Sequence, residues 1–175
     1  TGKISYKDLT EYSSDNNYAS NTIRNEGVLT LKSGTIENVS SDNVMSFGYP
    51  HAIDAYQGSI TNIEGGTVKS ENYDCIRMFC NSTTNKNSVT INGGLIEGYS
   101  AIWMQNPGAK TVNGSLAITG GEIRTTAAAY VNGTAEVKDV ASKIYCTTEG
   151  GAWTEDSAVS ITGGTINENV YLAAE

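Results

Sequence analysis

A motif of nine or ten residues recurs along this chain and constrains its fold more than any other feature. The clearest copy spans residues 87–96, where Val89 and Ile91 alternate with polar residues ahead of Gly93, Gly94 and a second aliphatic pair. Self-similarity at a steady spacing is the signature of a repeat architecture, in which each unit stacks on its neighbours. The other copies span residues 27–36, 60–68, 115–123 and 158–166.

The spacing of the copies sets the size of one structural unit. The second glycine of each copy falls at position 34, 66, 94, 121 or 164, at intervals of 32, 28, 27 and 43 residues. Strict alternation before the glycines predicts a strand with Val89 and Ile91 on one side. Gly93 and Gly94 would then form a corner, where φ is positive or a side chain would clash. Helical repeats would need apolar residues at helical spacing, and the sequence lacks them.

Each period also carries a second short strand built around an apolar pair. With isoleucine pointing inward at its second position, the fourth position points inward too, and the third and fifth point outward. The copies that align are residues 22–26, 52–56, 75–79, 101–105 and, more loosely, 128–132.

Together these patterns predict an all-β protein: a single-stranded, right-handed parallel β-helix, or β-solenoid, of about five coils. Parallel strands stack about 4.8 Å apart, which would place Ile63, Ile91, Ile118 and Ile161 in one inward column. Each such buried side chain contributes roughly 1.5–3 kcal/mol of transfer free energy. The right-handed winding is expected from the general preference of parallel crossovers.

Two segments lie outside the repeat. Residues 1–21 are expected to cap the first coil, and the spacing from Ser5 to Asp8, with Ile4, Leu9 and Tyr12, suggests a short capping helix. Residues 22–175 form the repeats, with an insertion at 133–157 that includes Trp153 and is expected to pack as a flap or to carry function. The chain ends in mid-coil by this register, which predicts neighbouring domains in a longer protein.

Charge and composition narrow the classes of partner. Only 17% of residues are charged and the net charge is −8, so a nucleic-acid partner is not expected. No apolar run approaches the roughly 20 residues of a membrane span, so no membrane insertion is expected. The three cysteines, Cys75, Cys80 and Cys146, are interpreted as thiols rather than a disulfide framework, although Cys146 could pair with one of the others. The low charge and the Asn/Thr-rich repeats favour an extracellular or cell-surface location.

Catalytic and metal-binding residues are sparse. His51 is the only histidine and follows a proline, which predicts a solvated turn residue rather than part of a zinc site or triad. Asp54 and Asp74, with Arg77 near them, could bring two carboxylates across a rung as glycoside hydrolysis requires. Polysaccharide-active enzymes on this fold carry much longer coils, so we expect no enzyme. Asp42, Asp54 and Asp74 supply oxygens that leave calcium as an open alternative, and no other cofactor is expected.

A strip of outward residues on the second strand is the best candidate for ligand binding. From coil to coil, the third position of this strand is occupied by a charged or an aromatic residue. The fifth position includes aromatic and amide side chains. Aromatic planes beside planar hydrogen-bonding groups suit sugar rings. The alternative is that the aromatic residues serve packing alone. The predicted binding residues are Arg24, Asp54, Tyr56, Arg77, Phe79, Trp103, Gln105 and Tyr130.

The copies at 29–36 and 160–166, joined by Ala-Ile segments, resemble a known group of repeats. These are the Thr-Ile-x-Gly-Gly-Thr-Ile repeats of large bacterial cell-surface proteins and adhesins, notably of gut Firmicutes. More weakly, residues 72–76 resemble clostridial carbohydrate-binding β-helix domains, but they lack the Gly and one Asp of that family's Gly-Asp-Asp-x-Ile calcium motif. The resemblance implies a non-catalytic module that binds a glycan or host-surface ligand. The alternatives are a purely structural stalk and a fragment of a polysaccharide lyase or hydrolase.

Overall fold

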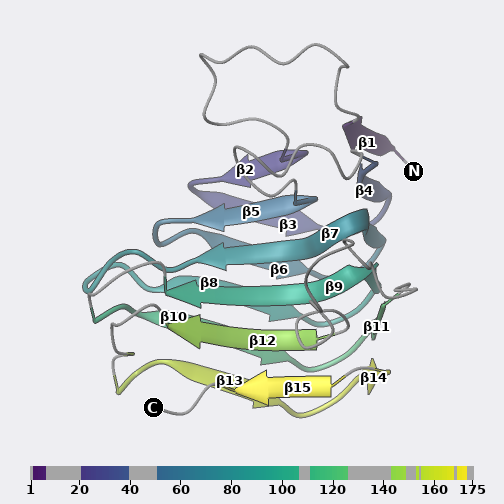
Figure 1. Ribbon diagram of the computed structural model, residues 1–175. Coiled ribbons are helices and arrows are strands. Elements are labelled where there is room, and N and C mark those ends of the chain that lie inside the picture. Colours follow the sequence, from purple (N-terminus) through teal and green to yellow (C-terminus); the bar gives the residue numbers. More distant parts are fainter. Residues whose placement is uncertain are drawn as a thin grey trace, which may run out of the picture.

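The computed structural model describes residues 2–6, 21–39, 51–106, 111–125, 143–148, 153, 155–167 and 169–172. Every regular element among these residues is a β-strand, and all the strand pairs are parallel (Figure 1). The strands are β1 (Lys3–Tyr6), β2 (Ile23–Asn25), β3 (Val28–Leu31), β4 (Thr35–Asn38), β5 (Ile53–Tyr56), β6 (Ile60–Ile63), β7 (Thr67–Phe79), β8 (Asn87–Ile91), β9 (Leu95–Asn106), β10 (Gly114–Ile118), β11 (Glu122–Thr125), β12 (Lys143–Thr148), β13 (Ala158–Ile161), β14 (Thr165–Ile166) and β15 (Asn169–Leu172).

The strands wind into a parallel β-solenoid, and residues 51–125 pass through about three turns. We name its three faces in chain order. Face 1 contains β2, β5, the second part of β7, the second part of β9, β12 and β15; face 2 contains β3, β6, β8, β10 and β13; face 3 contains β1, β4, the first parts of β7 and β9, β11 and β14. Faces 1 and 3 form one continuous sheet because β7 and β9 bend from one to the other (Figure 1).

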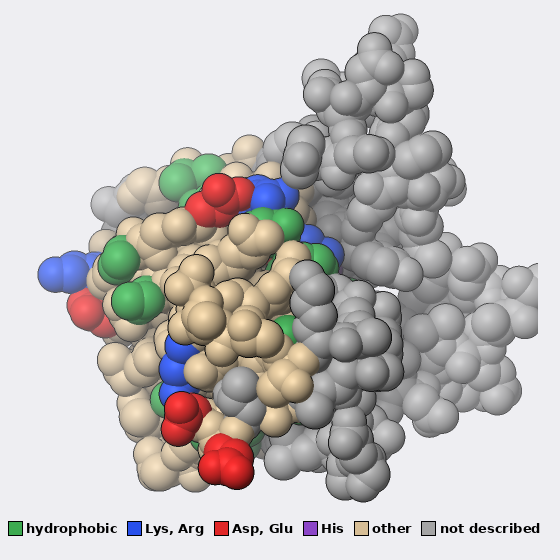
Figure 2. Space-filling view, turned by 90° about the vertical axis from the view of Figure 1, so that its left-hand side faces the viewer, with side chains coloured by type: hydrophobic (Ala, Val, Ile, Leu, Met, Phe, Trp, Pro, Cys, Tyr) green, Lys and Arg blue, Asp and Glu red, His purple; other side chains and the backbone are tan. Residues whose placement is uncertain are grey.

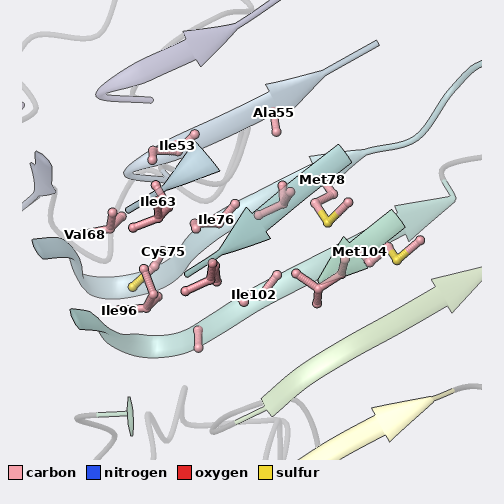
Figure 3. Close-up of a cluster of buried hydrophobic side chains, with 14 of the residues drawn as sticks. Ile53, Ala55, Ile63, Val68, Cys75, Ile76, Met78, Ile96, Ile102 and Met104 are labelled. Carbon is pink, nitrogen blue, oxygen red and sulfur yellow. The ribbon is translucent and has the colours of Figure 1, made fainter. Parts of the chain in front are cut away.

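The register confirms the predicted inward columns. On face 2, Leu31, Ile63, Ile91, Ile118 and Ile161 are successive partners, and Ile63, Ile91 and Ile118 are fully buried. Ile161, on the last strand of this face, shares the register but is 41% exposed. Figure 3 shows aliphatic and sulfur-containing side chains from face 1, face 2 and face 3 meeting inside the coil. The buried column on face 3 comprises Ile36, Val68, Ile96 and Ile123, and that on face 1 comprises Ile53, Ile76 and Ile102.

The glycine pair forms the corner between faces 2 and 3 for both of the predicted reasons. Gly94 has a φ of 81°, in the left-handed region, and the same holds for the second glycine of every copy. At Gly93, a Cβ atom would stand only 2.6 Å from the carbonyl oxygen of Glu64 in the preceding coil. The close stacking of rungs at this corner therefore requires residues without side chains.

Each of the two segments expected to lie outside the repeat contributes a strand to the solenoid. Residues 3–6 form β1, which pairs with β4 on face 3, so the capping helix expected to begin near Ser5 is wrong for these residues. The remaining residues of the expected helix, including Asp8, Leu9 and Tyr12, lie outside the described part of the chain. Within the expected insertion, β12 pairs with both β9 and β15 and is a regular strand of face 1.

Trp153, which also falls within the expected insertion, contacts the coil. Trp153 forms an isolated parallel bridge with Val112 and packs partly buried against the core, as a flap residue would. A Cβ atom at Gly114 would stand about 3.0 Å from the Trp153 ring and closer still to Met104 and Cys80. The absence of a side chain at Gly114 therefore leaves space for the Trp153 indole to pack against the coil.

We predict that Gly94→Ala lowers the free energy of unfolding by well over 1 kcal/mol. The left-handed backbone alone costs an L-residue about 1–2 kcal/mol, and the new Cβ would meet the Gly66 oxygen at 2.7 Å and the Gly65 carbonyl carbon at 2.9 Å. Urea unfolding followed by circular dichroism measures the change.

Gly27→Ala is the matched control, because nothing lies within 4 Å of its added Cβ and its φ is not in the left-handed region. It should leave stability unchanged or raise it by about 0.4–1 kcal/mol. Equal losses in the two variants would mean that the corner does not depend on Gly94.

Candidate functional site

Seven of the eight predicted binding residues are described, and they lie at outward positions of face 1, as the alignment of the first four coils predicted. Arg24, Asp54, Arg77 and Trp103 are successive register partners across β2, β5, β7 and β9. Tyr56, Phe79 and Gln105 form the second column. We call these seven residues the face-1 strip.

Asp54 and Arg77 form the centre of the strip. The Nε and Nη2 atoms of Arg77 each donate to a different carboxylate oxygen of Asp54, at 2.9 Å in both cases. The Asn21 side-chain amide donates a further hydrogen bond to Asp54 at 3.1 Å. Asp54 is fully buried, although its position on the strand points outward. A buried carboxylate needs this bidentate pairing, because an uncompensated charge would be costly to desolvate.

Two aromatic residues of the strip, Tyr56 and Phe79, pack against each other rather than presenting open faces. The Tyr56 and Phe79 rings stack with centroids 4.9 Å apart and planes within 4°. The Arg24 guanidinium lies 3.7 Å from the Tyr56 centroid, and Arg77 lies 5.0 Å from that of Phe79. Both rings are half-buried, so their edges, and little of their faces, remain for a ligand. The predicted charge pairing is found for Asp54 with Arg77, whereas Arg24 pairs with Glu26.

The last part of the strip differs from the prediction. Trp103 is half-buried, and Gln105 is 8% exposed. Tyr130 lies outside the described residues, and the place assigned to it beside Trp103 is taken by Tyr145 of β12. The loose alignment of residues 128–132 with this strand was therefore wrong. The long interval before Gly164 reflects a longer connection from β11 to β12.

His51 is buried in the same region, contrary to the expectation of a solvated turn residue. Its side chain is fully buried, with Nδ1 3.5 Å from Oδ2 of Asp74 and its ring 6.4 Å from that of Trp103. Neither ring nitrogen makes a hydrogen bond. Burial lowers the pKa of His51 well below 6.5, the positive charge of Arg77 adds to this, and the nearby backbone of Asp74 opposes it. His51 is therefore neutral near pH 7.

Face 3 carries a second set of paired charges, which the sequence reasoning missed. Lys3 pairs with Glu37, while Lys69 and Arg124 both pair with Glu97. Hydrogen bonds from Lys3 and Ser5 lower the pKa of Glu37. The signal is present in the sequence: in four copies, the residue three positions after the second glycine alternates in charge from coil to coil. Those residues are Glu37, Lys69, Glu97 and Arg124.

Of the residues considered for metal binding, Asp54 and Asp74 are described, and both are buried. Both carboxylate oxygens of Asp54 accept hydrogen bonds, and Asp42 lies outside the described residues. In the part of the chain that is described, no group of three or more His, Cys, Asp and Glu side chains is placed to hold a metal ion. Cys75 and Cys80 are buried and form no disulfide, and burial raises the pKa of the Cys75 thiol.

Comparisons with protein-family models, with curated proteins and with solved structures find no match to this chain. Among the described residues there is also no helix with the length and hydrophobicity to cross a membrane.

We predict that Asp54→Asn lowers the free energy of unfolding by about 2–3 kcal/mol. The substitution leaves the Arg77 charge without its carboxylate in a largely enclosed position, where its side chain is 17% exposed. Removing one partner of a buried pair costs roughly 3–5 kcal/mol, and the remaining exposure reduces this. Glu26→Gln is the matched control, because its carboxylate is 61% exposed and its pairing with Arg24 should contribute less than about 1 kcal/mol. A similar loss in the free energy of unfolding for both variants would contradict the conclusion that Asp54 and Arg77 form a buried, stabilising pair.

We also predict that His51 makes stability fall with acidification between pH 7.5 and 5.5. The folded state holds this ring neutral, while in the unfolded chain it takes up a proton below about pH 6.5. Its stabilising contribution is thus complete above that pH and is lost as pH falls, by up to about 1.4 kcal/mol per pH unit. Urea unfolding across this range should show the slope in the parent protein and a flatter profile in His51→Phe. Parallel profiles would contradict a buried neutral histidine.

Proposed function

We propose that the chain is a non-catalytic module of an extracellular bacterial surface protein, in which the solenoid is a rigid support that presents a glycan or host-surface ligand site. One observation carries this proposal: the buried Asp54 and the half-buried Glu97 are each paired with cations in neighbouring coils. Asp54 binds Arg77, and Glu97 binds both Lys69 and Arg124. Such pairs join successive rungs, which is what a support needs.

The same pairing argues against the polysaccharide-active enzyme. Glycoside hydrolysis needs one carboxylate that can take up a proton and a second that can act as a base or nucleophile. Both carboxylate oxygens of Asp54 accept hydrogen bonds from the Arg77 guanidinium, and its side chain has no exposed surface. Asp74 lies beside a buried, neutral His51. The two aspartates thus face different partners and do not form a solvent-accessible acid–base pair.

The proposal includes a right-handed solenoid of five coils as one part of a longer surface protein. The coil number is supported by the five successive strands of face 2. The handedness is supported by the strong general preference of parallel crossovers. The resemblance to surface repeats supports the location, and the acidic net charge of −8 suits neither nucleic acid nor an anionic membrane.

For the ligand site, the seven described residues of the face-1 strip are one option. Trp103, Tyr56 and Phe79 are each partly exposed and could meet a ligand at their edges. A purely structural stalk is the other option, since most polar groups of the strip are already engaged within the chain. If the face-1 strip is the ligand site, a correctly folded Trp103→Ala variant should bind glycan differently from the parent protein. A purely structural stalk predicts no difference.

We predict that the protein releases no product from pectins, glycosaminoglycans or xylans. Reducing ends and unsaturated uronates are measured after long incubation, with a known lyase and a known hydrolase as positive controls. Release of product that is lost in both Asp54→Asn and Asp74→Asn would overturn the non-catalytic proposal. Folding of these variants is checked by circular dichroism, because Asp54→Asn is expected to be less stable.

A further inference from the structure

Face 2 differs from the other two faces in carrying no charge at its outward positions. The burial of its strands alternates, which identifies two outward residues on each of the five strands. None of these ten residues is charged, although charged residues make up 17% of the chain. One outward column is Val28, Ile60, Ser88, Ser115 and Ala158, and the other is Thr30, Asn62, Thr90, Ala117 and Ser160.

The polar groups of face 2 are also unused within the described chain. The side chains of Thr30, Asn62 and Thr90 make no hydrogen bond to any described residue, and the same is true of the outward serines Ser88, Ser115 and Ser160. On face 1 the corresponding positions hold the Asp54–Arg77 pair, and on face 3 they hold the pairs around Glu97. Face 2 therefore keeps its hydrogen-bonding capacity for solvent or a ligand.

Face 2 is a regular array as well as an uncharged one. Its strands repeat about every 4.8 Å, and the two outward columns are separated by roughly 6.6 Å, twice the rise per residue. Hydroxyl and amide groups share it with aliphatic groups, among them Val28 at 73% exposure and Ile60 at 44%. Figure 2 views the side on which the chain passes from face 1 to face 2, where uncharged atoms predominate and charged side chains form small separate groups.

The size of face 2 favours a polymer over a protein partner. Five strands of about four residues give an area of roughly 300 Å². A stable protein interface buries about 800 Å² on each side and is anchored by aromatic residues or arginine, which face 2 lacks. A polymer can instead follow the array along the solenoid axis and collect many weak contacts.

We infer that face 2 is a binding surface for a flat, uncharged polysaccharide of the β-linked glucan or chitin type. This inference rests on the proposed function for its extracellular setting, and it names the ligand class and the face. Such ribbons present hydroxyl groups at their edges and C–H groups on their faces, which match the hydroxyl, amide and aliphatic groups of the two columns. An uncharged polymer also avoids the repulsion that an acidic one would meet from a chain of net charge −8. The irregular side chains within each column favour a polysaccharide over ice, whose lattice would require the same group on every rung.

The test uses microcrystalline cellulose and crystalline chitin in pull-down binding isotherms with the whole chain. Thr90→Lys places an ammonium at the centre of face 2, where contact with an uncharged surface would desolvate it. We expect binding of the parent protein to at least one of the two polymers, and a loss of about tenfold or more in Thr90→Lys. Thr67→Lys makes the same substitution at an outward position of face 3 and should bind within about twofold of the parent.

Four results would overturn this inference. They are no binding of the parent protein to either polymer, equal binding of Thr90→Lys and parent, loss of binding in Trp103→Ala with Thr90→Lys unaffected, and thermal hysteresis of ice growth without polysaccharide binding. Circular dichroism verifies that each variant is folded. The same incubations are assayed for released sugar, so the non-catalytic proposal fails only if product appears, whereas the face-2 inference fails on the binding data.

Discussion

The stacking of parallel rungs in register is the constraint on which the rest of this structure depends. It fixes each residue's vertical neighbours as the equivalent residues one repeat before and after it. Inside the coil, this stacks aliphatic side chains on one another, as with Ile63, Ile91 and Ile118, which are all fully buried. At roughly 1.5–3 kcal/mol for each buried aliphatic side chain, these columns are the largest favourable contribution that can be assigned to particular residues.

The same stacking imposes the opposite rule on charged side chains at the surface. A perfect repeat would place identical charges about 4.8 Å apart, and like charges in facing positions are destabilising. The repeats therefore agree at inward positions and alternate in sign at outward ones, as in Glu37, Lys69, Glu97 and Arg124 on face 3. This alternation also favours one order of coils, because a slip by one rung would bring equal charges together.

The fold could be predicted from the sequence where one local pattern determined the outcome. Alternation and the glycine pair were enough to identify face 2, the corner at Gly93 and Gly94, and the inward columns. The burial of His51 could not be predicted, because it depends on groups from other coils, namely Asp74 and Trp103. The place of Tyr145 was missed for a related reason. Residues 128–132 match the short apolar pattern almost as well as residues 143–148, and only the pairing with β9 distinguishes them.

The three faces differ in how strongly their outward side chains are bound to partners in adjacent coils. On faces 1 and 3, outward side chains hold their positions through partners in adjacent coils, as Asp54 and Arg77 do. A ligand that competed for those groups would have to break contacts that join the rungs, and the loss would offset its binding energy. The outward groups of face 2 can change partners without this loss, because the stability of that face resides in the aliphatic side chains beneath it. A solenoid can thus be rigid and adhesive together when its charged pairs and its binding groups occupy separate faces.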